Sequence, residues 1–230
     1  MKKRLQISLL LILLVAQYSI AQLSADEIIK KNMSVTGFDK QTIESFEILG
    51  FFQQGAMKLK MHMFGVLPDL FKMLAKIDSV TVIKSTNGSY SWEYSSKTDS
   101  VIFTDTEHNM SENFFLQWTG GLNRFLMGEI SAELVGTEKL ENIDVYKLKI
   151  TKNNKILYYY IDKLSYLILR IENIEKNENT YYIDYRKTGG LLLPHRLNGY
   201  KGSTPVMNII METIKINTPI NIQIFNVPQK

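Results

Sequence analysis

The sequence predicts a mainly β protein with helices (α+β), in which a single curved antiparallel sheet forms an incomplete β-barrel. After residue 43, most segments alternate apolar and polar residues and are separated by turns, as strands do. Two helical segments depart from this pattern, one N-terminal and one mid-chain. Because a large, strongly twisted sheet must curl or split, we expect these helices to cover its concave side.

The first 21 residues have the features of a cleavable secretory signal. Basic residues at positions 2–4 precede the apolar run 8–15, and Ser19 and Ala21 are the small residues of a cleavage site. The apolar run is too short for a transmembrane helix, although an uncleaved anchor is the alternative. We therefore expect a domain of residues 22–230 that is exported to the periplasm without an integral membrane segment.

Composition and charge exclude several classes of function. The chain has no cysteine, so disulfides, thiolate metal sites and cysteine nucleophiles are excluded. The formal net charge is +4, but without the three basic residues of the leader the 27 basic residues fall to 24, against 23 acidic ones. A nearly neutral domain gives no indication of binding to nucleic acid or to an anionic membrane.

The end signals of a helix are clear at the start of the expected domain. Ser24 is the expected N-cap, with Glu27 as its capping-box partner. Leu23 and Ile28 have the spacing of a hydrophobic staple, and Gly37 is the expected C-terminal stop. The apolar residues of this helix form one stripe, which should pack on the sheet.

Strands are expected on both sides of the mid-chain helical segment. The predicted strands are 46–52, 56–64, 70–77, 80–84, 89–94, 132–137, 145–151, 156–161, 166–174, 180–186, 191–200 and 206–216, with a final short strand at 222–225. Asn87-Gly88 is a strong hairpin turn, because both residues tolerate a positive φ. Since neither a linker nor an internal repeat is visible, one domain is the simplest interpretation.

The segment 109–130 is apolar without alternating. Ser111 can cap a helix there, and Gly120-Gly121 can separate this helix from a second short one. A surface helix would carry fewer aromatic side chains than this segment does. We therefore expect it to dock on the sheet.

No catalytic constellation is visible in the sequence. His62, His108 and His195 are far apart and lack the spacing of a metal-ligand pair, and we expect His195 to cap or flank a strand. Nucleophile elbows, Walker loops and dinucleotide-binding glycine motifs are also missing. Acidic pairs such as Glu172 with Glu175 lie among lysines, as on a solvated surface. The sequence therefore predicts neither an enzyme nor a metal or cofactor site.

Soft and aromatic side chains gather on the predicted strand faces. In GAMKLKMHM, residues 55–63, apolar residues alternate with lysine and histidine, so one face is apolar. Methionine adapts to varied apolar partners, and a pocket for acyl chains needs such a lining. The candidate cavity residues are Met57, Leu59, Met61, Met63, Phe71, Met73, Tyr90, Trp92, Phe114, Trp118 and Phe125. The alternative is that they form only the core between sheet and helices.

Two motifs, LPDLFKM at 67–73 and STNGSYSWEY at 85–94, resemble those of a known family. The matching residues are Pro68, Asp69 and Phe71 of a P-[ND]-x-F strand start, and Asn87, Gly88 and Trp92 of a [DN]-G-x-x-x-W hairpin. This pair resembles the periplasmic lipoprotein carriers and outer-membrane lipoprotein-sorting proteins of the LolA/LolB-like superfamily. The likeness extends over nearly all of 25–229, and the segments 25–40, 135–150 and 214–229 resemble those of Bacteroidetes-type members.

The resemblance implies a half-barrel whose mouth is closed by helices and whose hydrophobic cavity binds lipid acyl chains. It implies a monomeric, non-catalytic carrier of lipids or lipoproteins toward the outer membrane, with donor and acceptor proteins in the envelope. The chain departs from the family at Leu67, where typical carriers have a basic residue that helps to keep the lid closed. The alternatives are a structural or interaction module with a filled cavity and, third, a hydrolase acting on lipid or glycan.

Overall fold

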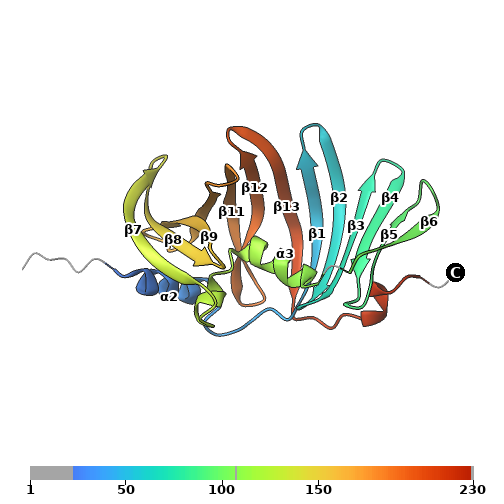
Figure 1. Ribbon diagram of the computed structural model, residues 1–230, viewed down its shortest axis with the longest axis horizontal. Helices are drawn as coiled ribbons and strands as arrows, with labels where there is room; N and C mark the ends of the chain where they lie inside the picture. The colour runs from blue at the N-terminus through green and yellow to red at the C-terminus, as the bar shows by residue number, and fades with distance from the viewer. Residues whose placement is uncertain (1–22, 107, 229–230) are drawn as a thin grey trace, which may run out of the picture.

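The computed structural model describes residues 23–106 and 108–228, so the predicted signal peptide at 1–21 lies outside the described residues. The described residues form a 13-stranded antiparallel sheet with the strand order β6-β5-β4-β3-β2-β1-β13-β12-β11-β10-β9-β8-β7. Its two outermost strands, β6 and β7, do not pair with each other, so the sheet stays open (Figure 1). This confirms the expected incomplete barrel.

The strands before the helical insert form one half of the sheet. They are β1 (Ser45–Gln54), β2 (Met57–Val66), β3 (Leu70–Ile77), β4 (Val80–Thr86), β5 (Ser91–Ser95) and β6 (Ser100–Thr104). The other half consists of β7 (Ser131–Leu140), β8 (Ile143–Lys152), β9 (Lys155–Asp162), β10 (Ile168–Asn173), β11 (Glu178–Thr188), β12 (Leu191–Lys201) and β13 (Thr204–Ile216). The predicted strands agree with these apart from shifts at their ends.

The sequence pattern misses one strand and misassigns another segment. The edge strand β6 is mostly exposed and shows no apolar alternation, which is why the pattern gives no signal there. The segment Ile222–Phe225, expected as a strand, is a 3-10 helix, η3. It lies across one face of the sheet instead of along an edge: the carbonyl oxygen of Phe225 accepts hydrogen bonds from the side chains of Ser85 and Trp92. The expected final strand is therefore wrong.

Helix α2 (Ala25–Thr36) begins and ends where its sequence predicts. The Glu27 amide donates to Ser24 Oγ at 3.2 Å and the Ser24 amide donates to Glu27 Oε2 at 2.8 Å, which completes the capping box. At the other end Gly37 has a φ of 87° and donates its amide to Met33. The buried apolar face of α2 packs on β7, β12 and the short 3-10 helix η2 (Leu122–Phe125).

The two faces of the sheet differ in what covers them. We call the face that carries α2 and α3 (Met110–Thr119) the concave face, and the other the convex face. Phe46, Gly65 and Phe71 are neighbours across β1, β2 and β3 on the concave face. A Cβ at Gly65 would lie 2.3 Å from the Phe46 ring, so only glycine lets this ring lie flat on the neighbouring strand.

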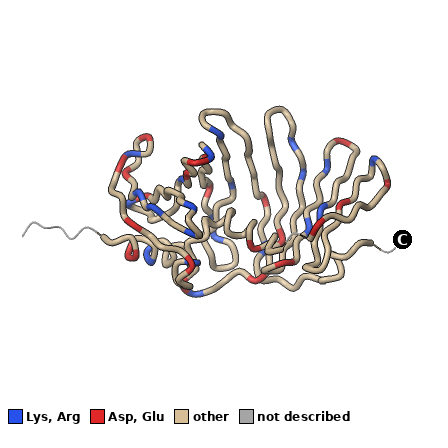
Figure 2. The backbone as a smooth tube through the Cα atoms, in the orientation of Figure 1, with Lys and Arg blue, Asp and Glu red and all other residues tan. Residues whose placement is uncertain are grey.

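Charged side chains of both signs are interspersed along the strands and turns (Figure 2). This agrees with the near-balance of acidic and basic residues in the expected domain. Among the described residues, no helix is both long and apolar enough to span a membrane.

Candidate functional site

Helix α3 lies across the concave face, in front of the middle of the sheet (Figure 1), and contacts β12 and β3. The Phe114 ring lies 5.4 Å from that of Phe46 and 5.9 Å from that of Phe71, between ring centres. Trp118 is fully buried, and its indole N–H donates to the carbonyl oxygen of Pro194 on β12 at 3.0 Å. The apolar side of α3 is therefore part of the core.

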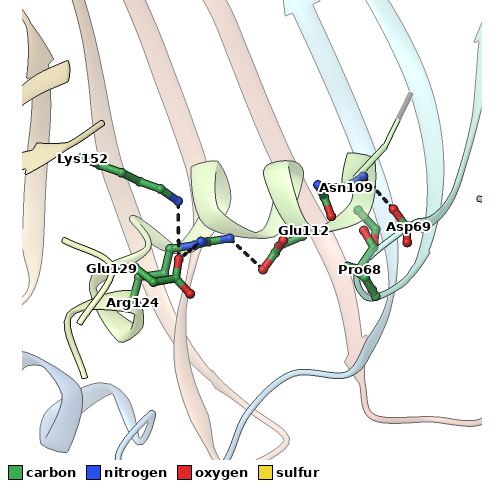
Figure 3. Close-up of polar contacts among 8 residues, drawn as sticks. Pro68, Asp69, Asn109, Glu112, Arg124, Glu129 and Lys152 are labelled. Atoms are coloured by element: carbon green, nitrogen blue, oxygen red, sulfur yellow. Dashed lines mark hydrogen bonds and ion pairs between the residues drawn. The ribbon is translucent and has the colours of Figure 1, made fainter. Parts of the chain in front are cut away.

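The N-terminal end of α3 is attached to the turn between β2 and β3 (Figure 3). The Asn109 amide donates to Asp69 Oδ1 at 2.8 Å, and the Glu112 amide donates to the Pro68 carbonyl oxygen at 3.1 Å. Ser111, expected as the N-cap, lies inside the helix, while Asn109 holds the cap position. The Ser111 hydroxyl instead donates to the carbonyl oxygens of Val66 and Pro68, because the helix start is pressed against this turn.

An ionic cluster joins α3 to η2 and β8 (Figure 3). Arg124 on η2 pairs with Glu112 on α3 at 2.7 Å and also with Glu129. Lys152 at the end of β8 lies 3.6 Å from the same Glu129 carboxylate. The Arg124 side chain is only 13% exposed, so its charge is compensated largely by these two carboxylates.

Two buried phenols hold the C-terminal end of α3. Tyr182 on β11 donates to the Gln117 carbonyl oxygen, and Tyr159 on β9 donates to that of Gly120, each at 2.8 Å. Burial raises the pKa of both hydroxyls well above the ordinary value of tyrosine. Both therefore remain protonated donors throughout the physiological pH range.

A cleft of about 430 Å³ opens beside this helix end, between α3, η2 and strands β8 to β11. Its floor is apolar and its mouth is polar. The floor consists of Leu116, Ile150, Leu157, Tyr159, Ile171 and Tyr182. The exposed Lys155 and Glu178 lie at the mouth, and Lys152 and the largely buried Arg124 also line the cleft. A volume of this size falls within the range of small-molecule pockets, about 300–1,000 Å³.

Neither a protein-family model nor a curated protein sequence matches the chain. Solved structures do resemble it. A DUF1329 family protein from Desulfovibrio piger has a TM-score of 0.54 at 14% identity, over 88% of this chain and 97% of that one. A putative outer membrane lipoprotein-sorting protein domain from Vibrio parahaemolyticus has a TM-score of 0.53 at 12% identity, over 88% of this chain and 97% of that one. A LolA superfamily protein from Nitrosomonas europaea has a TM-score of 0.53 at 10% identity, over 90% of this chain and 99% of that one.

The fold is LolA-like. This confirms the architecture that the two sequence motifs imply. At such low identity the similarity concerns the fold, and the kinship with Bacteroidetes-type members stays a prediction.

The LolA-like sheet distributes the predicted cavity residues over three environments. Met61, Met63, Phe71 and Trp118 are buried in the core, and Met73, Phe114 and Phe125 pack against it. At the N-terminal end of β2, Leu59 is half-buried and Met57 is 41% exposed. None of these described residues lines the 430 Å³ cleft. Met61 and Met63 are therefore part of the core, as in the alternative that the sequence left open, and a role of these residues in ligand binding stays a prediction.

Tyr90 and Trp92 do not belong to this wall. Trp92 pairs with Ser85, which in turn pairs with Lys72, and cross-strand partners lie on the same face of a sheet. This is the convex face, because the neighbouring Phe71 is on the concave one. Trp92 packs there beneath η3, and the Tyr90 hydroxyl lies 3.5 Å from Asn226 Oδ1. Grouping both with the methionines is therefore wrong.

Apart from Leu116 of α3, the floor of the cleft comes from strands that the sequence did not single out. Its residues are leucine, isoleucine and tyrosine in ordinary strand alternation, which resembles any core strand. One local signal exists in the Gly120-Gly121 pair. A Cβ at Gly120 would lie 2.5 Å from Ile168 Cδ1 on β10, so glycine allows the helix end to approach the sheet next to the cleft.

The histidines and acidic residues assemble no recognisable centre in the part of the chain that the structure describes. No group of three or more histidine and carboxylate side chains there could hold a metal ion. His195 lies within β12, and not at its edge as expected. It is buried, and its Nδ1–H donates to the Met211 carbonyl oxygen at 2.8 Å. Its ring therefore serves the pairing between β12 and β13.

Proposed function

We propose that this protein is a non-catalytic, exported carrier that binds an acyl chain of a lipid or lipoprotein in the concave cleft. The observation that carries the proposal is the cleft itself, which has a volume of about 430 Å³, an apolar floor and a polar mouth. Such a site suits a molecule with a hydrocarbon tail and a polar head. The lipoprotein-sorting domain and the LolA superfamily protein of the same fold support this class of cargo.

The energy of binding would come from burial. Each methylene group that leaves water contributes about 0.8 kcal/mol, and Leu157, Ile150 and Ile171 offer an apolar surface for it. The buried hydroxyls of Tyr159 and Tyr182 are already bound to α3, so they need no partner from the cargo. A single chain could therefore be held without a strong polar contact.

A displacement assay with a fluorescent fatty acid tests this proposal on residues 22–230. Leu157→Trp places a bulky ring in the cleft and should abolish or strongly weaken binding. Leu59→Trp is the matched control, because Leu59 is also a strand leucine but lies outside the cleft. Equal affinities for the two variants, or the lack of any fatty-acid binding by the native chain, would refute the proposal.

Native mass spectrometry of protein purified from its host provides a separate readout. We expect a co-purifying lipid, whose mass would identify the cargo. The competing function is an interaction module of the envelope, favoured by the burial of Met61 and Met63 in the core instead of in a cavity. That function predicts a lipid-free protein and no displacement.

A further inference from the structure

A second pocket lies on the convex face, on the far side of the sheet from the proposed lipid cleft. Its volume is about 370 Å³. Asn179 and Tyr181 come from β11, and Asn198 and Tyr200 from β12. Glu141, in the turn between β7 and β8, completes one side. Residues distant in the sequence therefore build this pocket.

The strand register arranges the four central side chains as alternating amides and phenols. Asn179 pairs with Tyr200, and Tyr181 pairs with Asn198. The rings of Tyr181 and Tyr200 meet edge to face, with ring centres 5.5 Å apart and an interplanar angle of 79°. Such a pair presents a firm apolar surface bordered by polar groups.

The amides are the unusual part of the pocket. The side-chain oxygens of Asn179, Asn198 and Asn208 are shielded from solvent and lack a hydrogen-bond partner among the described residues. Asn208 on β13 pairs directly with Asn198, so the amides are neighbours. A buried polar atom without a partner costs about 1–3 kcal/mol, and native proteins contain few of them. Two of the three, Asn179 and Asn198, line the pocket, so a ligand bound there can supply the missing partners.

A hydroxyl group is the ligand group that fits these amides. Turning an amide by 180° exchanges its oxygen and its NH₂ group, so each side chain can accept or donate. A hydroxyl also does both, and it can pair with Asn179 and Asn198 in either orientation. The Glu141 carboxylate adds an acceptor for hydroxyl donors.

The surrounding charges favour a neutral ligand. The Arg170 guanidinium lies 3.8 Å from the ring centre of Tyr160 and 5.9 Å from that of Tyr181. Arg170 is the cross-strand neighbour of Tyr181 on the same face, and its positive charge disfavours a second cation on this ring. On the other side, Glu141 disfavours an anion. Arg170 itself lies 3.8 Å from the Glu172 carboxylate, so charges of both signs border the pocket and neither sign dominates.

We propose that this convex pocket binds a neutral carbohydrate. The sugar's C–H face packs on Tyr181 and Tyr200, while its hydroxyls pair with the amides of Asn179 and Asn198 and with Glu141. The site is independent of lipid binding, because the lipid cleft lies on the opposite face of the sheet.

The test is titration of residues 22–230 with neutral trisaccharides (maltotriose, cellotriose and N-acetylchitotriose), followed by NMR. At least one sugar should shift the side-chain NH₂ resonances of Asn179 and Asn198. Tyr181→Ala should weaken this binding about tenfold, because it removes an aromatic contact, whereas Tyr181→Phe should retain most of it. Leu157→Trp, on the concave face, should leave it unchanged.

Three outcomes would overturn the proposal. The first is that none of the trisaccharides shifts these resonances at millimolar concentration. The second is sugar binding that survives Tyr181→Ala but is lost in Leu157→Trp, which would place the sugar in the concave cleft. The third is a clear preference for acidic oligosaccharides such as trigalacturonate. Circular dichroism of Tyr181→Ala separates loss of binding from loss of folding.

Discussion

The indole N–H of Trp118 and the carbonyl oxygen of Pro194 lie 3.0 Å apart, so the mid-chain helix is fixed to the middle of the sheet by a buried hydrogen bond. The chain has two tryptophans, and the other, Trp92, makes the equivalent bond on the convex face, to Phe225 at 2.9 Å. Each face of the sheet therefore has its own fluorescent reporter.

Single-tryptophan variants should separate the two faces. In Trp92→Phe, only Trp118 emits, and a fatty acid should change its emission because Gln117 and Leu116 beside it line the cleft. In Trp118→Phe, the remaining Trp92 should respond weakly. Fluorescence titration measures both. A larger response from Trp92 would contradict the concave placement of the cargo.

The substitution Trp118→Phe should also lower stability. It leaves the Pro194 carbonyl oxygen buried without its partner, which costs about 1–3 kcal/mol. Urea unfolding followed by circular dichroism measures the free energy of unfolding. An unchanged midpoint would show that the bond to Pro194 contributes little to holding α3.

Gly65→Ala should destabilise the fold by overpacking. Its Cβ would lie 2.3 Å from the Phe46 ring, and forced core contacts of this kind typically cost about 1–3 kcal/mol. Phe46→Leu makes room at the same place, so the double variant should be less destabilised than the sum of the single ones. Strict additivity in urea unfolding would show that the two residues do not compete for space.

Stability should fall as the solution is acidified below neutral pH, in part through His195. Burial lowers the pKa of this imidazole below its ordinary value of 6.5, so the unfolded chain takes up its proton at a higher pH than the folded one. The contribution is therefore present above about pH 6.5 and is lost as the pH falls through the folded-state pKa. His195→Gln should show a smaller loss between pH 7 and pH 5 in urea unfolding. A variant with the same pH dependence would contradict this role.

Arg124→Met should weaken the attachment of α3 and η2. It leaves Glu112 and Glu129 without their shared partner, and we expect a loss of about 1–3 kcal/mol because the arginine is largely buried. Lys139→Met is the matched control, since its ion pair with Asp144 is 3.9 Å long and both side chains are mostly exposed. Such surface pairs contribute about 0–1 kcal/mol. Equal losses in thermal melts would rule out a special role of Arg124.

Features that depend on neighbouring residues were predictable from the sequence. Ser24, Glu27 and Gly37 act within a few residues of α2, and strand alternation is equally local. The face on which Trp92 lies depends on register carried across several hairpins, which the sequence does not encode locally. The cleft depends on where α3 docks, and that is decided by distant contacts such as those of Tyr159 and Tyr182.

The strand order has a consequence for how the chain folds. In the described sheet, every pair of hydrogen-bonded neighbours is consecutive in sequence except β1 and β13. Strands β1 to β6 and β7 to β13 can therefore each grow as a ladder of local hairpins, which close quickly because their loops are short. Joining the two ladders must wait for β13, the last strand of the described sheet in chain order. Until then the edge of β1 is free to pair with other chains, so β1 is where a chaperone would have to act.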